Sequence, residues 1–187
     1  MEISAVVLAG GKSSRMGKDK ALLEFKGKSS LALFQYSKLQ KLFKKVYIST
    51  KEDKFDFKAN LIYDELPISS PLSALASICK NIDSNAFFLI AVDMPFVSQN
   101  TIKKLISAYQ KEPNFSAYIA KSPNGLEPTV AIYKKDILKT LNKFIAKNEF
   151  KLKLLLKELN IKEIEINNID EFFNINYYKD YKLSLKK

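Results

Sequence analysis

Short apolar runs alternate with longer segments of helical periodicity along most of this chain. Apolar residues that recur every three or four positions predict helices over Leu31–Lys44, Leu72–Lys80, Gln99–Tyr109, Lys135–Phe144 and Phe150–Leu159. The short runs predict strands over Ser4–Leu8, Val46–Ser49, Leu61–Tyr63, Phe87–Val92, Ala117–Ala120, Thr129–Tyr133 and Lys162–Ile166. Strands that alternate with helices are typical of βαβ units, so we expect an α/β fold built on a parallel sheet.

Two features refine the expected sheet. The run from Phe87 to Val92 has no polar alternation, which predicts a central strand that is buried on both faces. Asn124-Gly125 is typical of a turn between two closely spaced strands, so we expect one strand to run antiparallel to the others. The chain contains no linker, repeat or low-complexity segment. We therefore predict a single Rossmann-like three-layer domain over residues 1–187, with a mostly parallel sheet and an antiparallel strand.

Polar residues follow three of the predicted strands at the points where they end. The segment from Gly10 to Lys20 follows the first strand, Asp64 follows Leu61–Tyr63, and Asp93 follows Phe87–Val92. In open α/β sheets, ligands bind beyond the carboxyl ends of the strands. The sequence therefore predicts a ligand site at this edge, although an Asp at such a position also commonly caps a turn.

The loop after the first strand reads Leu-Ala-Gly-Gly-Lys-Ser-Ser-Arg-Met-Gly-Lys-Asp-Lys over residues 8–20. Glycines allow close backbone approach to a ligand, and free N–H groups in such a loop bind anions. The spacing is neither that of a Walker A loop nor G-x-G-x-x-G, because five residues separate Gly11 from Gly17 and Asp19 follows Lys18. The loop thus predicts a triphosphate cradle, and a solvated basic connection is the alternative.

The composition narrows the chemistry. The chain of 187 residues has no histidine, which excludes Ser-His-Asp and Cys-His catalysis and histidine metal sites. Nucleotidyl transfer remains available, because it needs positioning, charge neutralisation and Mg²⁺ on a carboxylate, with Mn²⁺ as an alternative. The net charge of +11 indicates anionic partners, but the lysines are scattered and no nucleic-acid-binding motif is present, so we expect no nucleic-acid partner.

The expected compartment follows from two further observations. A single cysteine excludes a disulfide framework and is typical of a reducing compartment. The sequence shows neither a signal peptide nor an apolar run of membrane-spanning length. We therefore expect a cytoplasmic protein that does not bind a membrane.

Residues 8–29, LAGGKSSRMGKDKALLEFKGKS, resemble the signature of the MobA family, L-A-G-G-x-S-x-R-M-G-x-D-K-x-L followed by a Gly-Lys turn. The segments Glu127–Tyr133 and Phe173–Asn176 resemble two later motifs of that family. The resemblance implies a molybdenum cofactor guanylyltransferase. Such an enzyme transfers GMP from GTP to the terminal phosphate of molybdenum-molybdopterin, releases pyrophosphate and produces the guanine dinucleotide form of the cofactor. Cofactor-accepting apoenzymes are further expected partners.

The resemblance also implies roles for individual residues. Arg15, Lys20 and Asp93 are the expected catalytic residues, and Asp93 is the expected metal ligand. An Asp at position 64 is expected to contact the guanine base, with an exposed turn Asp as the alternative. The expected substrate-binding set is Leu8, Ala9, Gly10, Lys12, Lys20, Ser49, Asp64 and Asp93.

The chain departs from the family pattern in several places. Relatives usually read Gly-Pro-Leu-x-Gly where this chain has Ser70-Pro71-Leu72-Ser73-Ala74, which bears on base recognition. Ser49 stands where relatives can carry Asn, Glu127 is acidic, and Tyr177-Tyr178 replaces Thr-Pro. The alternatives are a cytidylyl- or sugar-phosphate nucleotidyltransferase of the same fold, or a non-catalytic carrier of nucleotide or cofactor.

Overall fold

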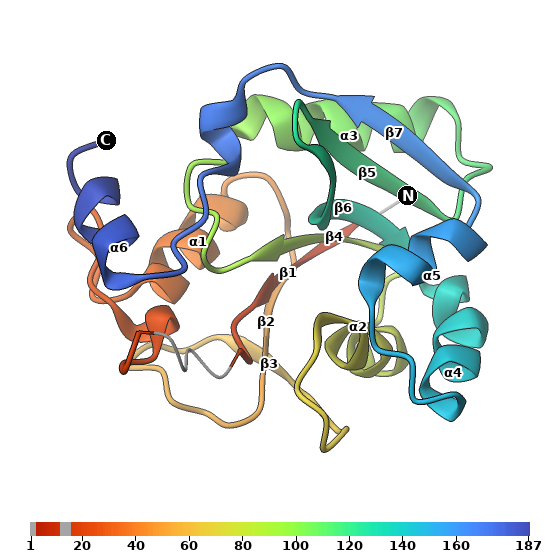
Figure 1. The fold of residues 1–187 in the computed structure, drawn as a ribbon, viewed down its shortest axis with the longest axis horizontal. Coiled ribbons are helices and arrows are strands. Elements are labelled where there is room, and N and C mark those ends of the chain that lie inside the picture. Colours follow the sequence, from red (N-terminus) through yellow and green to blue (C-terminus); the bar gives the residue numbers. More distant parts are fainter. Residues whose placement is uncertain (1–2, 12–15) are drawn as a thin grey trace.

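A single sheet organises the part of the chain that the computed structural model describes, residues 3–11 and 16–187. Its seven strands lie in the order β3-β2-β1-β4-β6-β5-β7, with β3 and β7 at the edges (Figure 1). The strands are β1 (Ser4–Leu8), β2 (Val46–Thr50), β3 (Asn60–Tyr63), β4 (Ala86–Ala91), β5 (Ala117–Ser122), β6 (Gly125–Lys134) and β7 (Ile161–Glu165).

The predicted antiparallel strand is β6. It pairs antiparallel with both β4 and β5, whereas the pairs β1–β2, β1–β4, β2–β3 and β5–β7 are parallel. The turn at Asn124-Gly125 joins β5 to β6, and Gly125 adopts φ +116°, a conformation that favours glycine. β6 begins four residues before the predicted Thr129, because a register shift at Ile119/Ala120 lets the hairpin continue to the turn.

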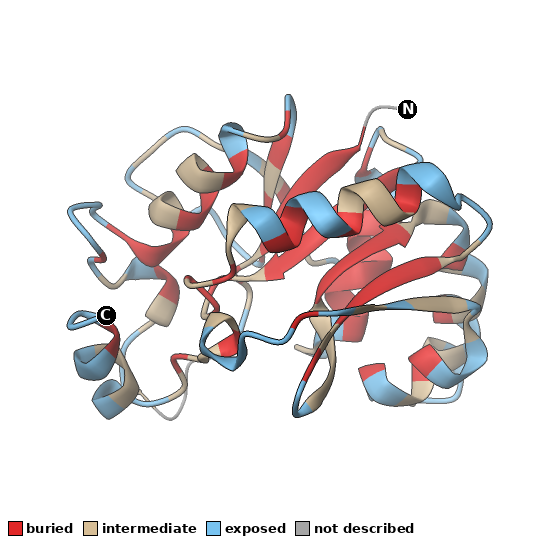
Figure 2. Ribbon diagram, turned by 90° about the horizontal axis from the view of Figure 1, so that it is seen from above, coloured by how far each residue is buried: buried red, intermediate tan, exposed pale blue. Residues whose placement is uncertain are grey.

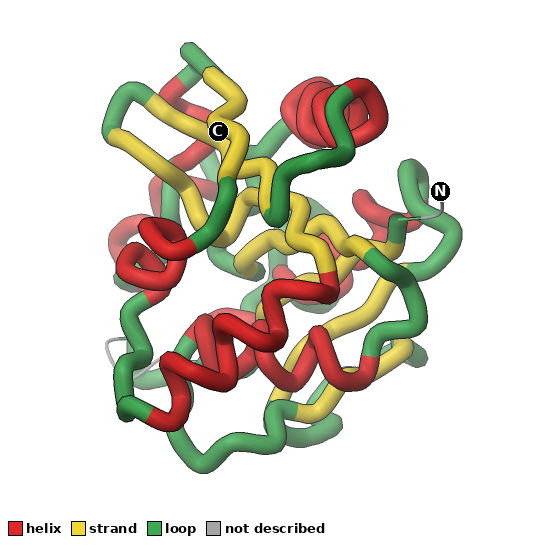
Figure 3. The backbone as a smooth tube through the Cα atoms, turned by 90° about the vertical axis from the view of Figure 1, so that its right-hand side faces the viewer, coloured by secondary structure: helices red, strands yellow, loops and turns green. Residues whose placement is uncertain are grey.

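Helices cover both faces of the sheet and make three layers (Figures 1 and 3). Helices α1 and α3 pack on one face, and α2, α4 and α5 lie on the other. Figure 2 shows that burial concentrates on the strands and on the inward sides of the helices. The helices are α1 (Leu31–Gln40), α2 (Pro71–Asn81), α3 (Gln99–Lys111), α4 (Leu138–Ala146), α5 (Leu152–Glu158) and α6 (Tyr178–Ser184).

The central strand β4 explains the layering. Phe88 and Ile90 join the hydrophobic cluster beneath α1 and α3, while Phe87 and Leu89 join the cluster beneath α2 and α4. All four side chains are fully buried, as the unbroken apolar run predicts. The Rossmann-like three-layer prediction is confirmed, because a mostly parallel sheet lies between two helical layers.

The element boundaries differ from the predictions mainly at helix ends. α1 ends at Gln40 rather than Lys44, and the predicted helix from Lys135 begins as a 3₁₀ turn over Lys135–Ile137 before α4. Two further 3₁₀ turns, Lys20–Leu22 and Ile169–Phe172, were not predicted. Among the described residues, none of the helices combines the length and apolarity needed to cross a membrane.

The sequence pattern gave no signal for α6, the last helix. It spans seven residues and begins after Tyr177, whose backbone N–H donates to the Asp180 carboxylate at 2.8 Å. The Tyr181 hydroxyl donates to the backbone carbonyl of Glu24 at 2.6 Å. A short helix with tyrosines in place of aliphatic residues carries little periodicity, so its position depends on this local cap and on the long-range contact with Glu24.

Candidate active site

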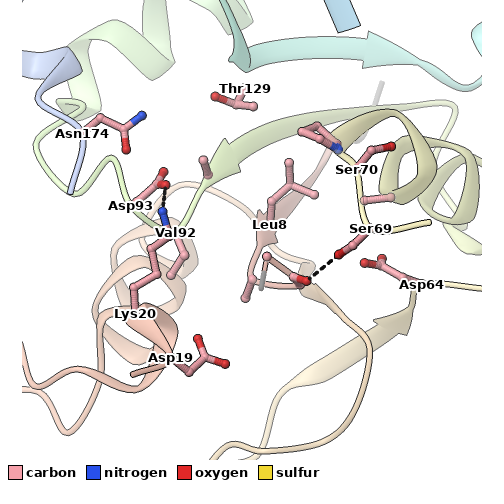
Figure 4. A pocket seen from close by; sticks show the side chains of 16 residues that line it. Leu8, Asp19, Lys20, Asp64, Ser69, Ser70, Val92, Asp93, Thr129 and Asn174 are labelled. Atoms are coloured by element: carbon pink, nitrogen blue, oxygen red, sulfur yellow. Dashed lines mark hydrogen bonds and ion pairs between the residues drawn. The ribbon is translucent and has the colours of Figure 1, made fainter. Parts of the chain in front are cut away.

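A pocket of about 330 Å³ opens where the loops after β1 and β4 meet. Its size lies within the usual range for small-molecule sites. Because β6 runs against its neighbours, the start of that strand reaches the same edge and contributes Thr129 (Figure 4). The lining residues are Leu8, Ala9, Gly10, Gly11, Asp19, Lys20, Asp64, Ser69, Ser70, Pro71, Ala74, Ala91, Val92, Asp93, Thr129 and Asn174.

An ion pair joins two loops on one side of this pocket. The ammonium group of Lys20 donates to Asp93 Oδ2, and it lies 3.5 Å from the carbonyl oxygen of Ile175 (Figure 4). The two side chains are 16% and 14% exposed, so the pair is shielded from much of the solvent screening. Lys20 lies on the 3₁₀ turn after the first loop, and Asp93 lies two residues after β4.

Two buried oxygens beside this pair have no hydrogen-bond partner among the described residues. They are Asp93 Oδ1 and Asn174 Oδ1, both on residues that line the pocket. The backbone N–H of Ile175 donates to the Asp93 carbonyl at 2.9 Å, which keeps the segments of Asp93 and Asn174 adjacent. Figure 4 shows both side chains on the same side of the pocket. Buried acceptors without donors are costly unless a ligand supplies the missing contact.

The two unpartnered oxygens, Asp93 Oδ1 and Asn174 Oδ1, are ligands that a hard divalent cation prefers. Mg²⁺ takes oxygen ligands, and it commonly uses one or two carboxylates together with phosphate oxygens and waters. The described residues contain no cluster of three or more His, Cys, Asp and Glu side chains, so this pocket resembles a substrate-assisted metal site rather than an all-protein cage. Asp93 and Asn174 are the side chains that could hold the ion.

Asp64 lies on the pocket wall formed by the end of β3, and its carboxylate is fixed. Ser49 Oγ donates to Asp64 Oδ1 at 2.7 Å, and the Asp64 N–H donates to the Thr50 carbonyl at 2.8 Å. Burial raises the pKa of Asp64, and the Ser49 hydrogen bond and the charges of Lys51 and Lys54 oppose that rise. One carboxylate oxygen is thus held by the protein while Oδ2 faces the first loop.

The Asp64 carboxylate leaves little space for a side chain at position 10. A Cβ atom at Gly10 would lie 2.5 Å from Asp64 Oδ2, which is closer than real Cβ contacts. A side chain at this position would therefore require the Asp64 carboxylate, which Ser49 holds, to move. Gly11 lies under no such constraint, since no described atom falls within 4 Å of a Cβ placed there.

The segment that departs from the family pattern, Ser70-Pro71-Leu72-Ser73-Ala74, forms the start of α2. Ser70 has φ −145° and ψ 156°, and its Oγ accepts a hydrogen bond from the Ser73 N–H at 3.0 Å. This is an N-cap in extended backbone, which any residue adopts. Positions 70 and 74 thus need no glycine here, and the preceding Ser69 Oγ donates to the Gly10 carbonyl at 3.3 Å.

The sequence analysis did not identify Lys54, which contacts both ends of the first loop. Its ammonium donates to the Ala9 carbonyl at 3.1 Å and forms an ion pair with Asp19 Oδ2. Asp19 Oδ1 in turn accepts from the Ala21 N–H at 2.9 Å and so caps the turn that carries Lys20. In a chain so rich in lysine, no local signal distinguishes Lys54.

The structure brings six of the predicted site residues together on the pocket. Leu8, Ala9, Gly10, Lys20, Asp64 and Asp93 all line the pocket. Ser49 is fully buried and donates a hydrogen bond to Asp64 rather than lining the pocket, and its expected contact with the substrate stays a prediction. Lys12 and Arg15 lie outside the described residues.

The two later motifs, Phe173–Asn176 and Glu127–Tyr133, lie only partly on the pocket. Asn174 lies on the pocket, whereas the Asn176 N–H donates to Asp180 at 3.1 Å at the start of α6. Glu127, the acidic departure, accepts a hydrogen bond from Ser122 Oγ at 2.8 Å within the β5–β6 hairpin. Its charge is therefore held inside the hairpin.

Comparison with known proteins identifies the family to which this chain belongs. The model of the MobA-like NTP transferase domain matches residues 5–163. The chain is 41% identical over 182 residues to a molybdenum cofactor guanylyltransferase of Campylobacter jejuni subsp. doylei, covering 96% of this chain and 94% of that protein. It is 35% identical over 189 residues to the enzyme of that name from Helicobacter pylori strain G27, covering 98% and 92%.

Solved structures support the same fold. The crystal structure of molybdopterin-guanine dinucleotide biosynthesis protein A from Archaeoglobus fulgidus superposes with a TM-score of 0.84 over 98% of this chain and 97% of that chain. The two sequences are 22% identical, so this likeness concerns the fold.

Proposed function

We propose, from the premise that this chain belongs to the MobA-like NTP transferase family, that it transfers GMP from GTP to the terminal phosphate of molybdenum-molybdopterin. Pyrophosphate is released, and the product is the guanine dinucleotide form of the cofactor. The observation that carries this proposal is the 41% identity to a molybdenum cofactor guanylyltransferase over 96% of the chain. A nucleotidyltransferase activity is thus established at the level of the family, and GTP and molybdenum-molybdopterin are the proposed substrates.

We assign each part of the nucleotide to a part of the site. In this proposal the backbone of Leu8, Ala9 and Gly10, which lines the pocket, contacts the base and ribose, and the loop that follows is the proposed binding segment for the phosphates. The Asp64 carboxylate accepts hydrogen bonds from the N1–H and N2–H₂ groups of guanine. A buried acceptor that matches these two donors discriminates against bases that lack them. Ser49 supports this choice by holding the carboxylate in place.

Lys20 and Asp93 are the proposed residues for binding and neutralising the phosphate groups during transfer. The terminal phosphate of molybdopterin is already ionised at neutral pH, so its oxygen attacks the α-phosphorus without a general base. A bond forms between that oxygen and the α-phosphorus, and the bond from the α-phosphorus to the bridging oxygen of pyrophosphate breaks. The Lys20 ammonium, joined by Arg15 from the first loop, stabilises the negative charge that moves onto the leaving pyrophosphate.

A divalent metal ion is the proposed cofactor, with Mg²⁺ the expected ion and Mn²⁺ an alternative. The unpartnered Oδ1 atoms of Asp93 and Asn174 support this proposal. Bound there, the ion would neutralise phosphate charge. Asp93 supplies the carboxylate, and Lys20 balances its charge when the ion is absent.

The proposed function is tested by pyrophosphate release from the purified protein with Mg²⁺, molybdenum-loaded molybdopterin and either GTP or CTP. We expect release with GTP and little with CTP. Release with CTP alone would make the protein a cytidylyltransferase. Nucleotide binding without release from either substrate would indicate a carrier, and both outcomes would contradict the proposal.

A further inference from the structure

The turn that carries Asp93 is held from behind by one face of α1. Gln35 Nε2 donates to the carbonyl oxygens of Ala91 at 3.2 Å and Met94 at 2.9 Å. These two acceptors flank Val92 and Asp93, so one amide group spans the base of the turn. Gln35 is fully buried.

Lys38 continues this row of donors one helical turn later. Its ammonium donates to the carbonyl oxygens of Pro95 at 3.0 Å and Val97 at 3.1 Å. Residues three apart on a helix lie on the same face, so Gln35 and Lys38 act from one surface of α1. Together they bind four backbone carbonyl oxygens, from Ala91 at the end of β4 to Val97 shortly before α3. We call these two residues and their four acceptors the α1 clamp.

The surroundings of Lys38 favour hydrogen bonding over solvation. Burial lowers the pKa of Lys38 to about 7, and the Glu171 carboxylate opposes that shift. Glu171 itself accepts from the Ser98 N–H at 2.8 Å and from Thr101 Oγ1 at 2.7 Å, which fixes the far end of the same turn. The Phe34 ring lies 5.7 Å from the ammonium. The two carbonyl oxygens that Lys38 binds explain why a lysine is buried at this position.

The clamp acts on the backbone on either side of Asp93. Val92 donates its N–H to the Leu8 carbonyl at 3.0 Å, and the Asp93 carbonyl accepts from Ile175 at 2.9 Å. The turn is therefore fixed to β1 on one side and to the segment of Asn174 on the other, and α1 supplies the third support. A shift of this turn would move Asp93 relative to both Lys20 and Asn174.

We propose that Gln35 and Lys38 are positioning residues that hold the Asp93 carboxylate in its place for the metal ion. This inference rests on the proposed function, in which Asp93 binds the ion. Neither side chain lines the pocket, so both act through the backbone of residues 91–97. Partners that orient a metal ligand typically change metal affinity by about 10- to 100-fold when they are removed.

The test uses Mn²⁺ as the probe, titrated together with saturating GTP into the purified full-length protein and followed by water-proton relaxation enhancement, because the proposed site takes phosphate oxygens besides Asp93 and Asn174. Gln35→Met and Lys38→Met remove the donors while roughly keeping side-chain length and apolar volume. We expect each to weaken Mn²⁺ binding by about tenfold or more. Lys38→Arg keeps the donors and should restore much of the affinity, and Lys41→Met, an exposed change at the end of α1, should have no effect.

Thermal unfolding of each variant distinguishes a loss of Mn²⁺ affinity caused by a displaced Asp93 from one caused by a destabilised protein. If both methionine variants remain folded and bind Mn²⁺ as the unchanged protein does, the clamp has no positioning role and the inference is overturned. If Lys38→Met fails to fold, Gln35→Met still decides the question. If Mn²⁺ binds in an Asp93-dependent manner but no GMP is transferred, the proposed function fails while the titration still decides the clamp. If Mn²⁺ binding does not depend on Asp93, both fail.

Discussion

Lys20 and Asp93, which are 73 residues apart in the sequence, form an ion pair on one side of the pocket. The pair uses Asp93 Oδ2 and leaves Oδ1 without a partner among the described residues. The arrangement gives the carboxylate two distinct sides, one neutralised by the protein and one available to a metal ion. The position of Asp93 is in turn determined by α1, Leu8 and Ile175 rather than by its own side chain.

Loss of the Asp93 carboxylate should abolish transfer without unfolding the protein. Asp93→Ala removes the proposed metal ligand, so we expect pyrophosphate release to fall to background while the circular dichroism spectrum is retained. Asp83→Ala is the matched control, because that carboxylate is exposed and pairs with Lys45 at 3.1 Å far from the pocket. Normal turnover by Asp93→Ala would contradict the metal assignment.

Removing one member of the Lys20–Asp93 pair should cost more stability than removing both. Each single variant, Lys20→Met or Asp93→Asn, leaves a largely buried partner without its counterpart. We expect a coupling free energy on the order of 1–3 kcal/mol in a double-mutant cycle of urea unfolding. A coupling energy indistinguishable from zero would show that the pair is only an incidental contact.

Gly10→Ala should impair nucleotide binding through Asp64. The added methyl group would collide with Asp64 Oδ2, and Ser49 restricts the movement by which the carboxylate could yield. We expect the affinity for GTP to fall by about tenfold, equivalent to about 1.4 kcal/mol, in a calorimetric titration. A Gly10→Ala protein that binds GTP as tightly as the unchanged protein would contradict this account.

Ser49→Ala should change the pH dependence of GTP binding. The Ser49 hydrogen bond opposes the rise in the pKa of Asp64 that burial causes, so its removal should raise that pKa further. Because the proposed contact with guanine needs the ionised carboxylate, affinity is lost as the pH falls through the pKa of Asp64. The variant should therefore lose affinity at a higher pH than the unchanged protein. Superimposable pH profiles would exclude this role for Ser49.

Lys38 should make the folded protein more stable as the pH rises. Burial lowers the pKa of Lys38 from 10.5 to about 7, so between these values the unfolded chain binds more protons than the folded one. The free energy of unfolding then increases with pH across this window. Lys38→Met should remove that slope relative to Lys41→Met, as measured by urea unfolding at several pH values. If the free energy of unfolding of Lys38→Met still rises with pH in the same way, the pH dependence belongs to other groups and this prediction is wrong.

The general form of the fold could be read from hydrophobic patterning. The unbroken run in β4 correctly predicted a strand buried on both faces, and Asn124-Gly125 correctly predicted an antiparallel neighbour. Polar residues at the ends of the strands also indicated which loops meet, because the carboxyl ends of parallel strands share an edge. Gly10, Asp64 and Asp93 do line one pocket, although their roles remain predictions.

The supporting contacts could not be predicted because they join residues that are distant in the sequence. The hydrogen bond from Ser49 to Asp64 depends on the pairing of β2 with β3. Gln35 and Lys38 read as ordinary positions of an amphipathic helix, and only the packing of α1 against residues 91–97 gives them partners. Local periodicity carries no information on such pairings.

The transfer of a labelled nucleotide tests the central claim most directly. The protein is incubated with Mg²⁺, molybdenum-loaded molybdopterin and GTP that carries ³²P at either the α- or the γ-phosphorus, and the cofactor is then isolated. The account predicts label in the cofactor from α-labelled GTP and none from γ-labelled GTP, with Asp93→Ala giving neither. Label from the γ-position, or an unlabelled cofactor with both substrates, would contradict GMP transfer by this protein.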